Sequence, residues 1–592
     1  MAEHPSLPEA QKSTLAIMEK TFRCYIMEDA QARALKEELT ALEGALEGSR
    51  NNMKLGYEAP DGTGFVEASS VLLRTRMRTA GDEATRRACF DAAAAVGPAV
   101  APGLARVAAL RNRLARALGY PDFYDYKVQA AEGFDKKRLF EILDGLEART
   151  RPVMQAARAW VADKHGAAAL QPWNLGFATA GDVTVAQDPY FPFEDAVEAW
   201  ARSFAALGIK YAGSTMRLDL CDRKGKYSNG FCHWPVPTYV KSGGSRVASE
   251  ANFTSLATPS APGSGHSALT TLMHEGGQCV PSLRILRLVC SCADVLTCVR
   301  CPFCIRSAAH FANVAQPSPF FSQERAPTSV AYAETQSMFL DSLVDDAAWL
   351  GRYARSREGK PMPWELVEAG IRATHPTSVL SLRAMIAVCY FEKAMYEMSE
   401  EQLAAPGALE RLAAEVETRI QGGPSPRPLL TVPHILSDES SCYYHGYVLA
   451  EMAVHQTRAH FMKAYGRLVD EPRIGADLAR VYWAPGNGAA FLDLVQQLTG
   501  APLSGDAWVA SLSQDIEALV ASERVEYDEA IRAGPVLPPG GGADIDMRCV
   551  LVHGEEVIAD SGPAGGADAA ARFAHAPAVF KAWVRRPYVD GK

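Results

Sequence analysis

Apolar residues recur at helical spacing through most of the chain. Residues 14–48 show this clearly, because charged positions separate the apolar ones in QARALKEELTALEGALEG. Apolar residues that return every three to four positions give a helix one apolar face, which packs inward. Similar Ala- and Leu-rich patterns predict helices at 82–118, 137–166, 192–208, 363–373, 378–399, 407–420, 441–468 and 506–531. The pattern predicts a mainly α fold.

The pattern changes in the middle of the chain. STMRLDLCDRKGKYSNGFCHWPVPTYV and SRVASEANFTSLATPS contain short β-like runs separated by Gly, Pro and Ser. They predict a small sheet just before the helix of SGHSALTTLMHEGG. An exposed edge strand can bind an extended peptide through its backbone, and SEANFTS is the candidate edge. A surface hairpin without a ligand role is the alternative. YEAPDGTGFV predicts a loop or hairpin.

Composition and charge limit the class of partner. The 592 residues are 48% hydrophobic and 22% charged, which is typical of a soluble globular protein. A net charge of -9 argues against nucleic acid or an anionic membrane as the main partner. The N-terminus has no basic segment followed by an apolar core, and no apolar run reaches the length of a membrane span. These features predict a cytoplasmic protein, with an organelle as the alternative.

The cysteines are unevenly distributed. Six of the 13 lie between Cys279 and Cys304, whereas the others are scattered singly, as buried or free thiols usually are. The run Cys298-x2-Cys301-x2-Cys304 is a pattern that can bind zinc or an iron–sulfur cluster. However, it lacks the usual final Cys-Pro, and it interrupts another metal motif.

That other motif begins at His274. Two His four positions apart share one face of a helix and can hold one Zn²⁺, while a Glu after the first His can activate water. The sequence supplies His274 and Glu275, but Gln278 stands where the second His belongs. A neutral amide is a poor zinc ligand. Taken alone, the pair is as consistent with a helix surface as with a metal site.

Downstream residues favour the metal site. The helix APTSVAYAETQSMFLDSL carries Glu334 three residues before Ser337, and PHILSDESSCYYHGYVLAEMAVHQTRAHF follows later. With LDLCDRKGKYSNGFC and ANFTS before His274, these motifs resemble the M3 family of zinc peptidases, the thimet oligopeptidase and oligoendopeptidase F group. The resemblance covers roughly residues 200–530. It implies a two-lobed helical metallopeptidase with a deep channel, in which His274 and Glu334 bind one Zn²⁺.

The resemblance also implies roles for other residues. Glu275 would be the general base and then the proton shuttle. His434 would help hold the substrate, and Tyr443 and Tyr447 would donate hydrogen bonds to the oxyanion, although Tyr447 matches only with a one-residue insertion. The family's Gly-Gly-Tyr after the His is replaced by Ser437, Asp438 and Glu439, so a substrate-contacting Tyr and two hinge-like glycines are absent. A packed amphipathic helix is the alternative interpretation of the tyrosines.

In the family, the metal helix continues as His-Glu-x-Gly-His-x-x-His-Phe. Here HEGG ends at Gly277 and AAHF resumes at residue 308. Codons for Gln278–Val280 can contain a GTGCGT splice donor, and an AGC codon for Ser307 can supply the terminal AG of an intron. Removing the sequence between these sites joins the remaining CA and C into a His codon, so that HEGG continues in frame as His-AAHF. Removing 29 residues also shortens the spacing from residue 278 to Glu334 from 56 to 27, close to the family's. We therefore predict that 278–307 is a retained intron; a genuine insertion is the alternative.

The predicted function is a zinc-dependent oligopeptidase that hydrolyses short unstructured peptides with metal-activated water. A catalytically disabled peptide-binding homologue, or a Cys-cluster metalloprotein on the same scaffold, is the alternative. We predict a helical N-terminal lobe at 1–200, a catalytic lobe at 201–533, and a linker with a small hairpin-plus-helix appendage at 534–592. The oligomeric state is left open.

Overall fold

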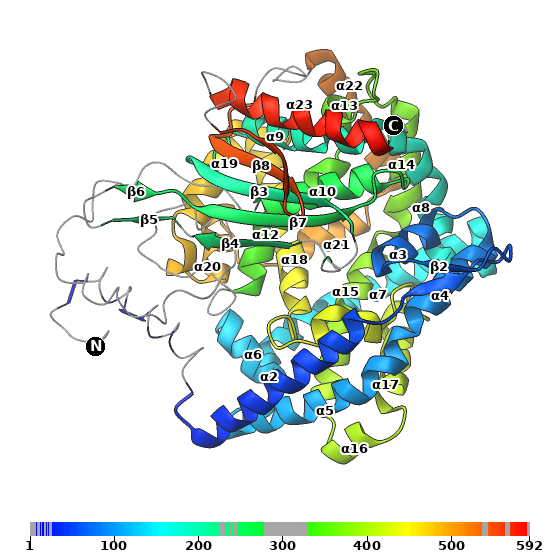
Figure 1. Ribbon diagram of the computed structural model, residues 1–592, viewed down its shortest axis with the longest axis vertical. Coiled ribbons are helices and arrows are strands. Elements are labelled where there is room, and N and C mark those ends of the chain that lie inside the picture. The colour runs from blue at the N-terminus through cyan, green and yellow to red at the C-terminus, as the bar shows by residue number, and fades with distance from the viewer. Residues whose placement is uncertain are drawn as a thin grey trace.

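The computed structural model describes residues 27–223, 231–236, 238–241, 245–277, 329–534, 543–562 and 569–588, with a few single positions besides. Helices form most of this part of the chain, and a small sheet lies among them (Figure 1). This confirms the predicted mainly α fold with a small sheet beside the helix of His274.

The first part of the chain is helical apart from one hairpin. Its α-helices are α2 (Ala30–Asn51), α3 (Ser70–Thr79), α4 (Glu83–Ala94), α5 (Val96–Ala117), α6 (Phe123–Glu132), α7 (Lys136–His165), α8 (Pro172–Gln187) and α9 (Ala196–Ala206). Strands β1 (Gly56–Glu58) and β2 (Phe65–Glu67) pair antiparallel, so YEAPDGTGFV is a hairpin. Five of the helices begin after an Asp or Ser whose side chain accepts a first-turn backbone N–H: Asp29, Ser69, Asp82, Asp122 and Asp135.

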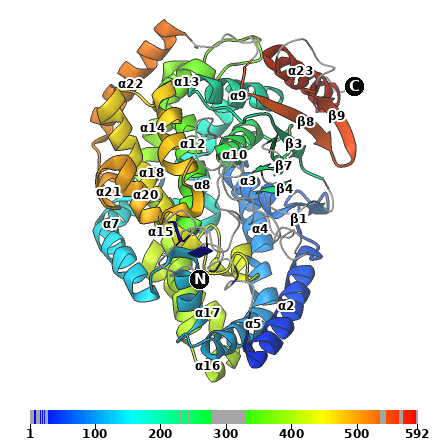
Figure 2. The ribbon, with the colours of Figure 1, turned by 90° about the vertical axis from the view of Figure 1, so that its left-hand side faces the viewer.

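The rest of the chain is also mostly helical. Its α-helices are α10 (Ser264–Gly277), α12 (Val330–Asp341), α13 (Ala347–Tyr353), α14 (Trp364–Thr374), α15 (Val379–Glu397), α16 (Glu400–Ala404), α17 (Ala408–Gln421), α18 (Tyr444–Tyr465), α19 (Pro472–Leu478), α20 (Phe491–Thr499), α21 (Asp506–Leu512), α22 (Ile516–Ala533) and α23 (Ala569–Tyr588). Short 3₁₀ segments connect many of them, and a π-helical turn, Ala479–Trp483, follows α19. Figure 2 shows α2, α5 and α17 gathered at one end of the molecule and α22, α13 and α23 at the other.

Five strands form the central sheet in the order β4-β7-β3-β8-β9. They are β3 (Ser214–Cys221), β4 (Phe231–Val236), β7 (Glu250–Ala257), β8 (Met547–His553) and β9 (Glu556–Asp560). Strand β3 runs parallel to both of its neighbours, with Met216 opposite Ala251 on β7 and Cys549 on β8. A separate two-stranded ribbon pairs β5 (Tyr239–Val240) with β6 (Arg246–Val247).

The candidate edge strand SEANFTS was assigned wrongly. It forms β7, which lies between β3 and β4, so both of its backbone edges are hydrogen-bonded. In the five-stranded sheet, as far as the structure describes it, β4 and β9 are the edge strands. Burial explains the difference, because Ala251 and Phe253 of β7 are both buried and an interior position protects them.

The C-terminal tail contributes to the central sheet. Its predicted hairpin is β8 and β9, and its predicted helix is α23, which packs against both strands. Strand β8 pairs with β3 from Ser214 to Asp219 rather than lying beside the main body as a separate unit. Helix α23 also contacts the segment before α9: Phe580 packs edge-on against Phe193 at 5.7 Å between ring centroids, and Lys581 forms an ion pair with Asp195. The predicted lobe boundaries stay predictions.

One large hydrophobic core runs through both halves of the chain, and Trp200, Trp349 and Trp483 are completely buried in it. By length and composition, Glu83–Ala117 is apolar enough to cross a membrane, a criterion that a core helix also satisfies. It consists of α4 and α5, and much of α5 is buried in the core. All six cysteines in the described part of the chain are free, as the scattered ones were expected to be: Cys89, Cys221, Cys232, Cys389, Cys442 and Cys549.

Candidate metallopeptidase site

Helix α10 carries His274 and Glu275 directly after strand β7. The start of the helix lies against the backbone near Phe191, where a Cβ on Gly265 would come within 1.7 Å of the Phe191 carbonyl oxygen. Only glycine allows this approach. Leu272 and Met273 are buried on the core side of the last turn, which leaves His274 facing the neighbouring helix α12. Local packing therefore sets the direction of the His274 side chain.

His274 meets two carboxylates of α12. Its Nε2 atom lies 3.3 Å from Oε2 of Glu334, and its Nδ1 atom lies 2.7 Å from Oδ2 of Asp341. Burial acts to lower the pKa of His274, but hydrogen bonds with Asp341 and Glu334 outweigh burial and hold that pKa well above its usual value. In zinc sites, a carboxylate on the second nitrogen of a His ligand fixes the tautomer and orients the ring. Asp341 occupies that place.

The spacing between His274 and Glu334 suits two ligands of one metal ion. Ligands about 2.1 Å from a tetrahedral Zn²⁺ lie about 3.4 Å apart, and the observed separation of 3.3 Å agrees. Within the described residues, no group of three or more His, Cys, Asp or Glu side chains forms a complete metal site. The two side chains thus fit as part of a site whose third protein ligand is expected at or after residue 278.

Glu334 is buried on a helix whose N-terminus is tightly held. The Glu132 carboxylate of α6 accepts hydrogen bonds from the backbone N–H groups of Val330 and Ala331, at 3.0 and 3.2 Å, and from the Ser329 hydroxyl. This carboxylate satisfies two N–H groups that the first turn leaves without intrahelical partners, and its negative charge suits the positive end of the helix. The position of Glu334 along α12 is therefore anchored from α6.

Glu275 is buried beside the metal-ligand pair. Burial is the main cause that raises the pKa of Glu275, to about 7; the charge of His274 opposes the rise and that of Glu334 adds to it. A backbone hydrogen bond from Cys232 of the edge strand β4 also reaches this carboxylate. Glu275 thus lies between the candidate ligands and the strand along which an extended peptide could pair.

A cluster of His and Tyr faces Glu334 from the other side. The Tyr443 hydroxyl donates to Oε1 of Glu334 at 2.5 Å, which leaves Oε2 directed at His274. The Tyr447 hydroxyl lies 3.3 Å from Nε2 of His434, and the rings of Tyr443 and Tyr447 are 5.2 Å apart. Burial, reinforced by the charge of Glu334, raises the pKa of Tyr447 well above its usual value, so its hydroxyl stays protonated. The Tyr447 hydroxyl is consequently available as a hydrogen-bond donor, whereas the Tyr443 hydroxyl donates to Glu334.

Close helix packing brings this cluster to Glu334. A Cβ on Gly446 would lie 2.2 Å from Cγ1 of Val330, so the start of α18 approaches the start of α12 only because residue 446 is glycine. Just before α18, Cys442 adopts φ +52°, a left-handed conformation that costs energy for a residue with a Cβ. The Cys442 backbone N–H donates to the buried Glu392 carboxylate at 2.8 Å, which holds this turn.

The segment of His434 is fixed by a fully buried arginine. Arg111 of α5 donates to the carbonyl oxygens of Ile435 and Leu436 at 2.9 and 3.0 Å, to the Tyr396 hydroxyl and to Glu43. Two backbone groups next to His434 are therefore hydrogen-bonded to α5.

Asp438 stands where the family has a glycine, and it forms ion pairs with Lys36 and Lys127. Burial alone would raise the pKa of Asp438, but Lys127 and Lys36 hold that pKa well below its usual range. In place of hinge-like glycines, the segment after His434 has an ionic attachment to α2 and α6.

All six site residues predicted in the described part of the chain lie together: His274, Glu275, Glu334, His434, Tyr443 and Tyr447. Their catalytic and metal-binding roles stay predictions. Gln278, the cysteines from 279 to 304 and the AAHF segment lie outside the described residues. Asp341 was missed, although its spacing of seven residues from Glu334 places both on one face of α12. No local sequence signal pointed to Arg111 or Glu132.

Comparisons with known proteins agree with this arrangement. A family model, Peptidase family M3, matches residues 76–283. A search of curated proteins finds no sequence match. The solved structure of PZ peptidase A with inhibitor 2 shares the fold with a TM-score of 0.56 and 14% identity, over 87% of this chain and 80% of that chain.

The M32 carboxypeptidase from Deinococcus radiodurans R1 aligns with a TM-score of 0.49 and 13% identity, over 89% of this chain and 86% of that one. The fold is therefore shared with PZ peptidase A, and in this protein the motif residues of α10, α12 and α18 converge. Residues 76–283 are thus similar to peptidase family M3, whose members are peptide hydrolases that are generally metal-dependent.

Proposed function

We propose that the protein is a zinc-dependent oligopeptidase that hydrolyses short unstructured peptides. The observation that carries the proposal is the convergence of His274, Glu334 and Tyr443. One carboxylate oxygen of Glu334 is directed at His274 and the other accepts from Tyr443, while Glu275 is buried next to them. In this arrangement the Glu334 carboxylate can bind a metal ion through one oxygen, and its other oxygen holds Tyr443, the proposed hydrogen-bond donor to the substrate, next to that ion.

Each group then has a task in peptide hydrolysis. Zn²⁺, when bound, would supply Lewis-acid chemistry, polarising the peptide carbonyl and making water more acidic. Glu275 takes the proton from the attacking water and passes it to the amine that leaves. Tyr443 and Tyr447 donate to the oxygen on which negative charge develops, and His434 orients Tyr447 through its ring nitrogen.

Residues 278–307 are proposed to be the translation of a retained intron. The family match supports this, because it ends at residue 283, six positions after Gly277, whereas Glu334 and the His434 segment lie beyond it. An uninterrupted family member would be expected to match across its zinc helix. Sequencing the mature transcript across codons 278–307 tests the proposal: a message that joins HEGG to HAAHF supports it, and a message with all of these codons overturns it.

The mechanism is tested by Glu275→Gln in the chain in which a single His replaces residues 278–307 and so joins HEGG to AAHF. This change keeps the size of the side chain and removes the base, so hydrolysis of a quenched fluorescent peptide should be lost while bound zinc is unchanged. Turnover like that of the unchanged protein would overturn the role of Glu275. Glu555→Gln, on the exposed turn between β8 and β9, is the matched control and should leave both quantities unchanged.

One observation favours a second function. With all 592 residues present, Gln278 stands where the second imidazole belongs, and such a chain would bind peptides without cleaving them. Stoichiometric zinc without hydrolysis would support this peptide-binding homologue, or a zinc site among the clustered cysteines. Substitution of Cys298 and Cys301 separates the two, since only the cysteine site would lose its metal. Short peptides are the proposed partners and the cytoplasm is the proposed location.

A further inference from the structure

The chain enters α18 through a strained turn. Cys442, the residue before Tyr443, has a φ of +52°, a value that residues with a Cβ rarely adopt. Before it, the Ser441 backbone N–H donates to the carbonyl oxygen of Ser437 at 2.9 Å, and after it, the Gly446 backbone N–H donates to the carbonyl oxygen of Tyr443 at 2.8 Å. Cys442 therefore connects two hydrogen-bonded turns, and its left-handed conformation sets the direction in which the chain reaches Tyr443.

A buried carboxylate supports this turn. Glu392 of α15 is completely buried, and its Oε1 atom accepts the Cys442 backbone N–H at 2.8 Å. Its other oxygen, Oε2, is also buried and has no hydrogen-bond partner among the residues that the structure describes. Burial is the main cause that raises the pKa of Glu392 to about 7, while hydrogen bonding from Cys442 and the charges of Arg111 and Lys127 oppose the rise. A half-satisfied carboxylate in the interior costs stability, so stabilisation of the fold does not explain it.

Tyr443 connects the turn with the metal-ligand pair. Its hydroxyl donates to Oε1 of Glu334 at 2.5 Å, and Oε2 of the same carboxylate lies 3.3 Å from Nε2 of His274. Helix α18 packs against both α15, which carries Glu392, and α12, which carries Glu334. Every step from Glu392 to Glu334 is therefore a hydrogen bond or a covalent bond of the chain.

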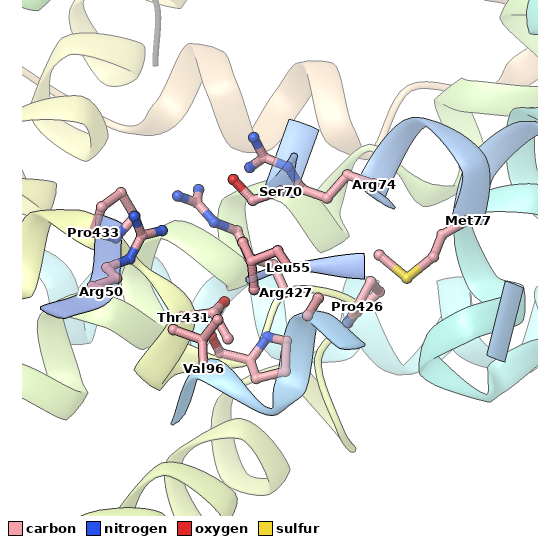
Figure 3. A pocket seen from close by; sticks show the side chains of 12 residues that line it. Arg50, Leu55, Ser70, Arg74, Met77, Val96, Pro426, Arg427, Thr431 and Pro433 are labelled. Atoms are coloured by element: carbon pink, nitrogen blue, oxygen red, sulfur yellow. The ribbon is translucent and has the colours of Figure 1, made fainter. Parts of the chain in front are cut away.

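The next residue, Tyr444, is held by a different contact. Its hydroxyl accepts a hydrogen bond from Arg427 at 3.0 Å. Arg427 lines a pocket together with Pro433 (Figure 3). This contact involves the side chain of Tyr444 rather than the backbone of the turn. It therefore supports the start of α18 but leaves the conformation of Cys442 to Glu392.

We propose that Glu392 is a positioning residue, which holds Cys442 in the left-handed conformation that places the Tyr443 hydroxyl beside the metal-ligand pair. This inference rests on the proposed peptidase function. Backbone strain that the surrounding structure maintains is found mainly at functional sites. The buried carboxylate then has a role, because Tyr443 can donate to a developing oxyanion only if its hydroxyl is held at a fixed place.

Relief of the strain tests the role of Glu392. In the chain with a single His in place of residues 278–307, Glu392→Met fills similar space without an acceptor. It should lower kcat for a quenched fluorescent peptide about tenfold with little change in KM, because Tyr443 is misplaced. Glycine adopts a positive φ without strain. The double variant Glu392→Met/Cys442→Gly should therefore recover most of kcat, whereas Glu392→Met/Cys442→Ala, which keeps a Cβ, should not.

Three further variants show whether the effect is specific. Glu392→Gln keeps an oxygen acceptor and should lose less of kcat than Glu392→Met. Glu401→Met is the matched control, because Glu401 is exposed on α16, and it should leave kcat unchanged. Arg427→Met removes a contact beside the turn, and Cys442→Gly should not recover any loss of kcat that it causes. Recovery there would show that glycine acts without regard to Glu392, and would overturn the proposal. Thermal unfolding of each variant confirms that it folds.

A measurement without hydrolysis separates this inference from the proposed activity. The full chain is labelled with fluorotyrosine, and the fluorine NMR resonance of Tyr443 is assigned by its loss in Tyr443→Phe. This resonance should shift in Glu392→Met and return in Glu392→Met/Cys442→Gly.

The outcomes then distinguish the two proposals. An unshifted Tyr443 resonance in Glu392→Met, a shift that glycine at residue 442 does not reverse, or an unchanged kcat in Glu392→Met overturns the positioning role and leaves the peptidase intact. The predicted shift and its reversal in a protein that cleaves no peptide support the positioning of Tyr443 by Glu392 and remove only the proposed activity.

Discussion

The buried Arg111 offers a sharp test of how the site is positioned. Its guanidinium is completely buried, and it bonds the Glu43 carboxylate and the carbonyl oxygens of Ile435 and Leu436. Arg111→Met fills similar space but removes every donor. The variant leaves Glu43 buried without its cation and two carbonyl groups without these donors, directly after His434.

The expected loss of stability is large. Removing one partner of a buried ion pair costs about 3–5 kcal/mol, because the other charge stays in the interior unpaired. The two carbonyl groups would each add about 1–3 kcal/mol if water could not reach them. Since such contributions are not additive, we expect the free energy of unfolding to fall by about 4 kcal/mol near neutral pH.

The pH dependence identifies the cause. Even in the presence of Arg111, burial raises the pKa of Glu43 above its usual value. Without the arginine this pKa rises further, so the folded variant holds a proton that the unfolded chain releases. A group with a raised folded pKa destabilises increasingly as pH rises through the window between its unfolded and folded values. The deficit of Arg111→Met should therefore be larger at pH 8 than at pH 5.

Urea unfolding followed by circular dichroism, at several pH values, measures this deficit. The double variant Arg111→Met/Glu43→Gln removes both charges and should recover much of the loss. A deficit below about 1 kcal/mol, or one that grows as pH falls, would refute the reasoning. In the same variant, kcat should fall while bound zinc stays constant, because the metal-ligand pair does not contact Arg111.

Further predictions concern the metal-ligand pair and the helix packing around it. Asp341→Asn removes the carboxylate that orients His274 and should weaken zinc binding about 10- to 100-fold in competition with a chelator; unchanged affinity would exclude that role. Tyr443→Phe should lower kcat about 100-fold with little change in zinc content, in steady-state assays of peptide hydrolysis; an unaltered kcat would rule out its role as a donor. Gly446→Ala forces α18 away from α12 and should cost about 1–3 kcal/mol in thermal unfolding, whereas Gly44→Ala, which has open space, should not. An unaltered melting temperature for Gly446→Ala would contradict the close approach.

The local spacing of apolar and polar residues was enough to predict most helices. The apolar spacing of residues 137–166 and 378–399 corresponds to α7 and α15 within one or two positions. Hairpins were also predictable, because turn residues mark them. The sequence also predicted that Glu334 lies beside His274. Helix geometry alone relates only residues that are near in sequence, so this longer-range pairing was predicted from the resemblance to the M3 family.

Long-range pairing was not predictable in the same way. Strand β8 pairs with β3 across more than 300 residues, and no feature of MRCVLVH identifies its neighbour. The same holds for Arg111, whose partners at Ile435 and Leu436 are backbone groups without any sequence signature. The assignment of SEANFTS as an edge failed for this reason, because the sequence around its second neighbour, β4, is interrupted by Gly, Pro and Ser and gives no pairing signal.

The central claim is that His274 and Glu334 hold a catalytic zinc ion. The most direct measurement is zinc content together with cleavage of a quenched peptide library, on the chain in which a single His replaces residues 278–307. The account predicts one zinc ion per chain, hydrolysis that a chelator stops and zinc restores, and loss of both zinc and activity in Glu334→Ala. A chain that folds and binds zinc stoichiometrically but cleaves no peptide, or one that cleaves peptides equally well after Glu334→Ala, would contradict it.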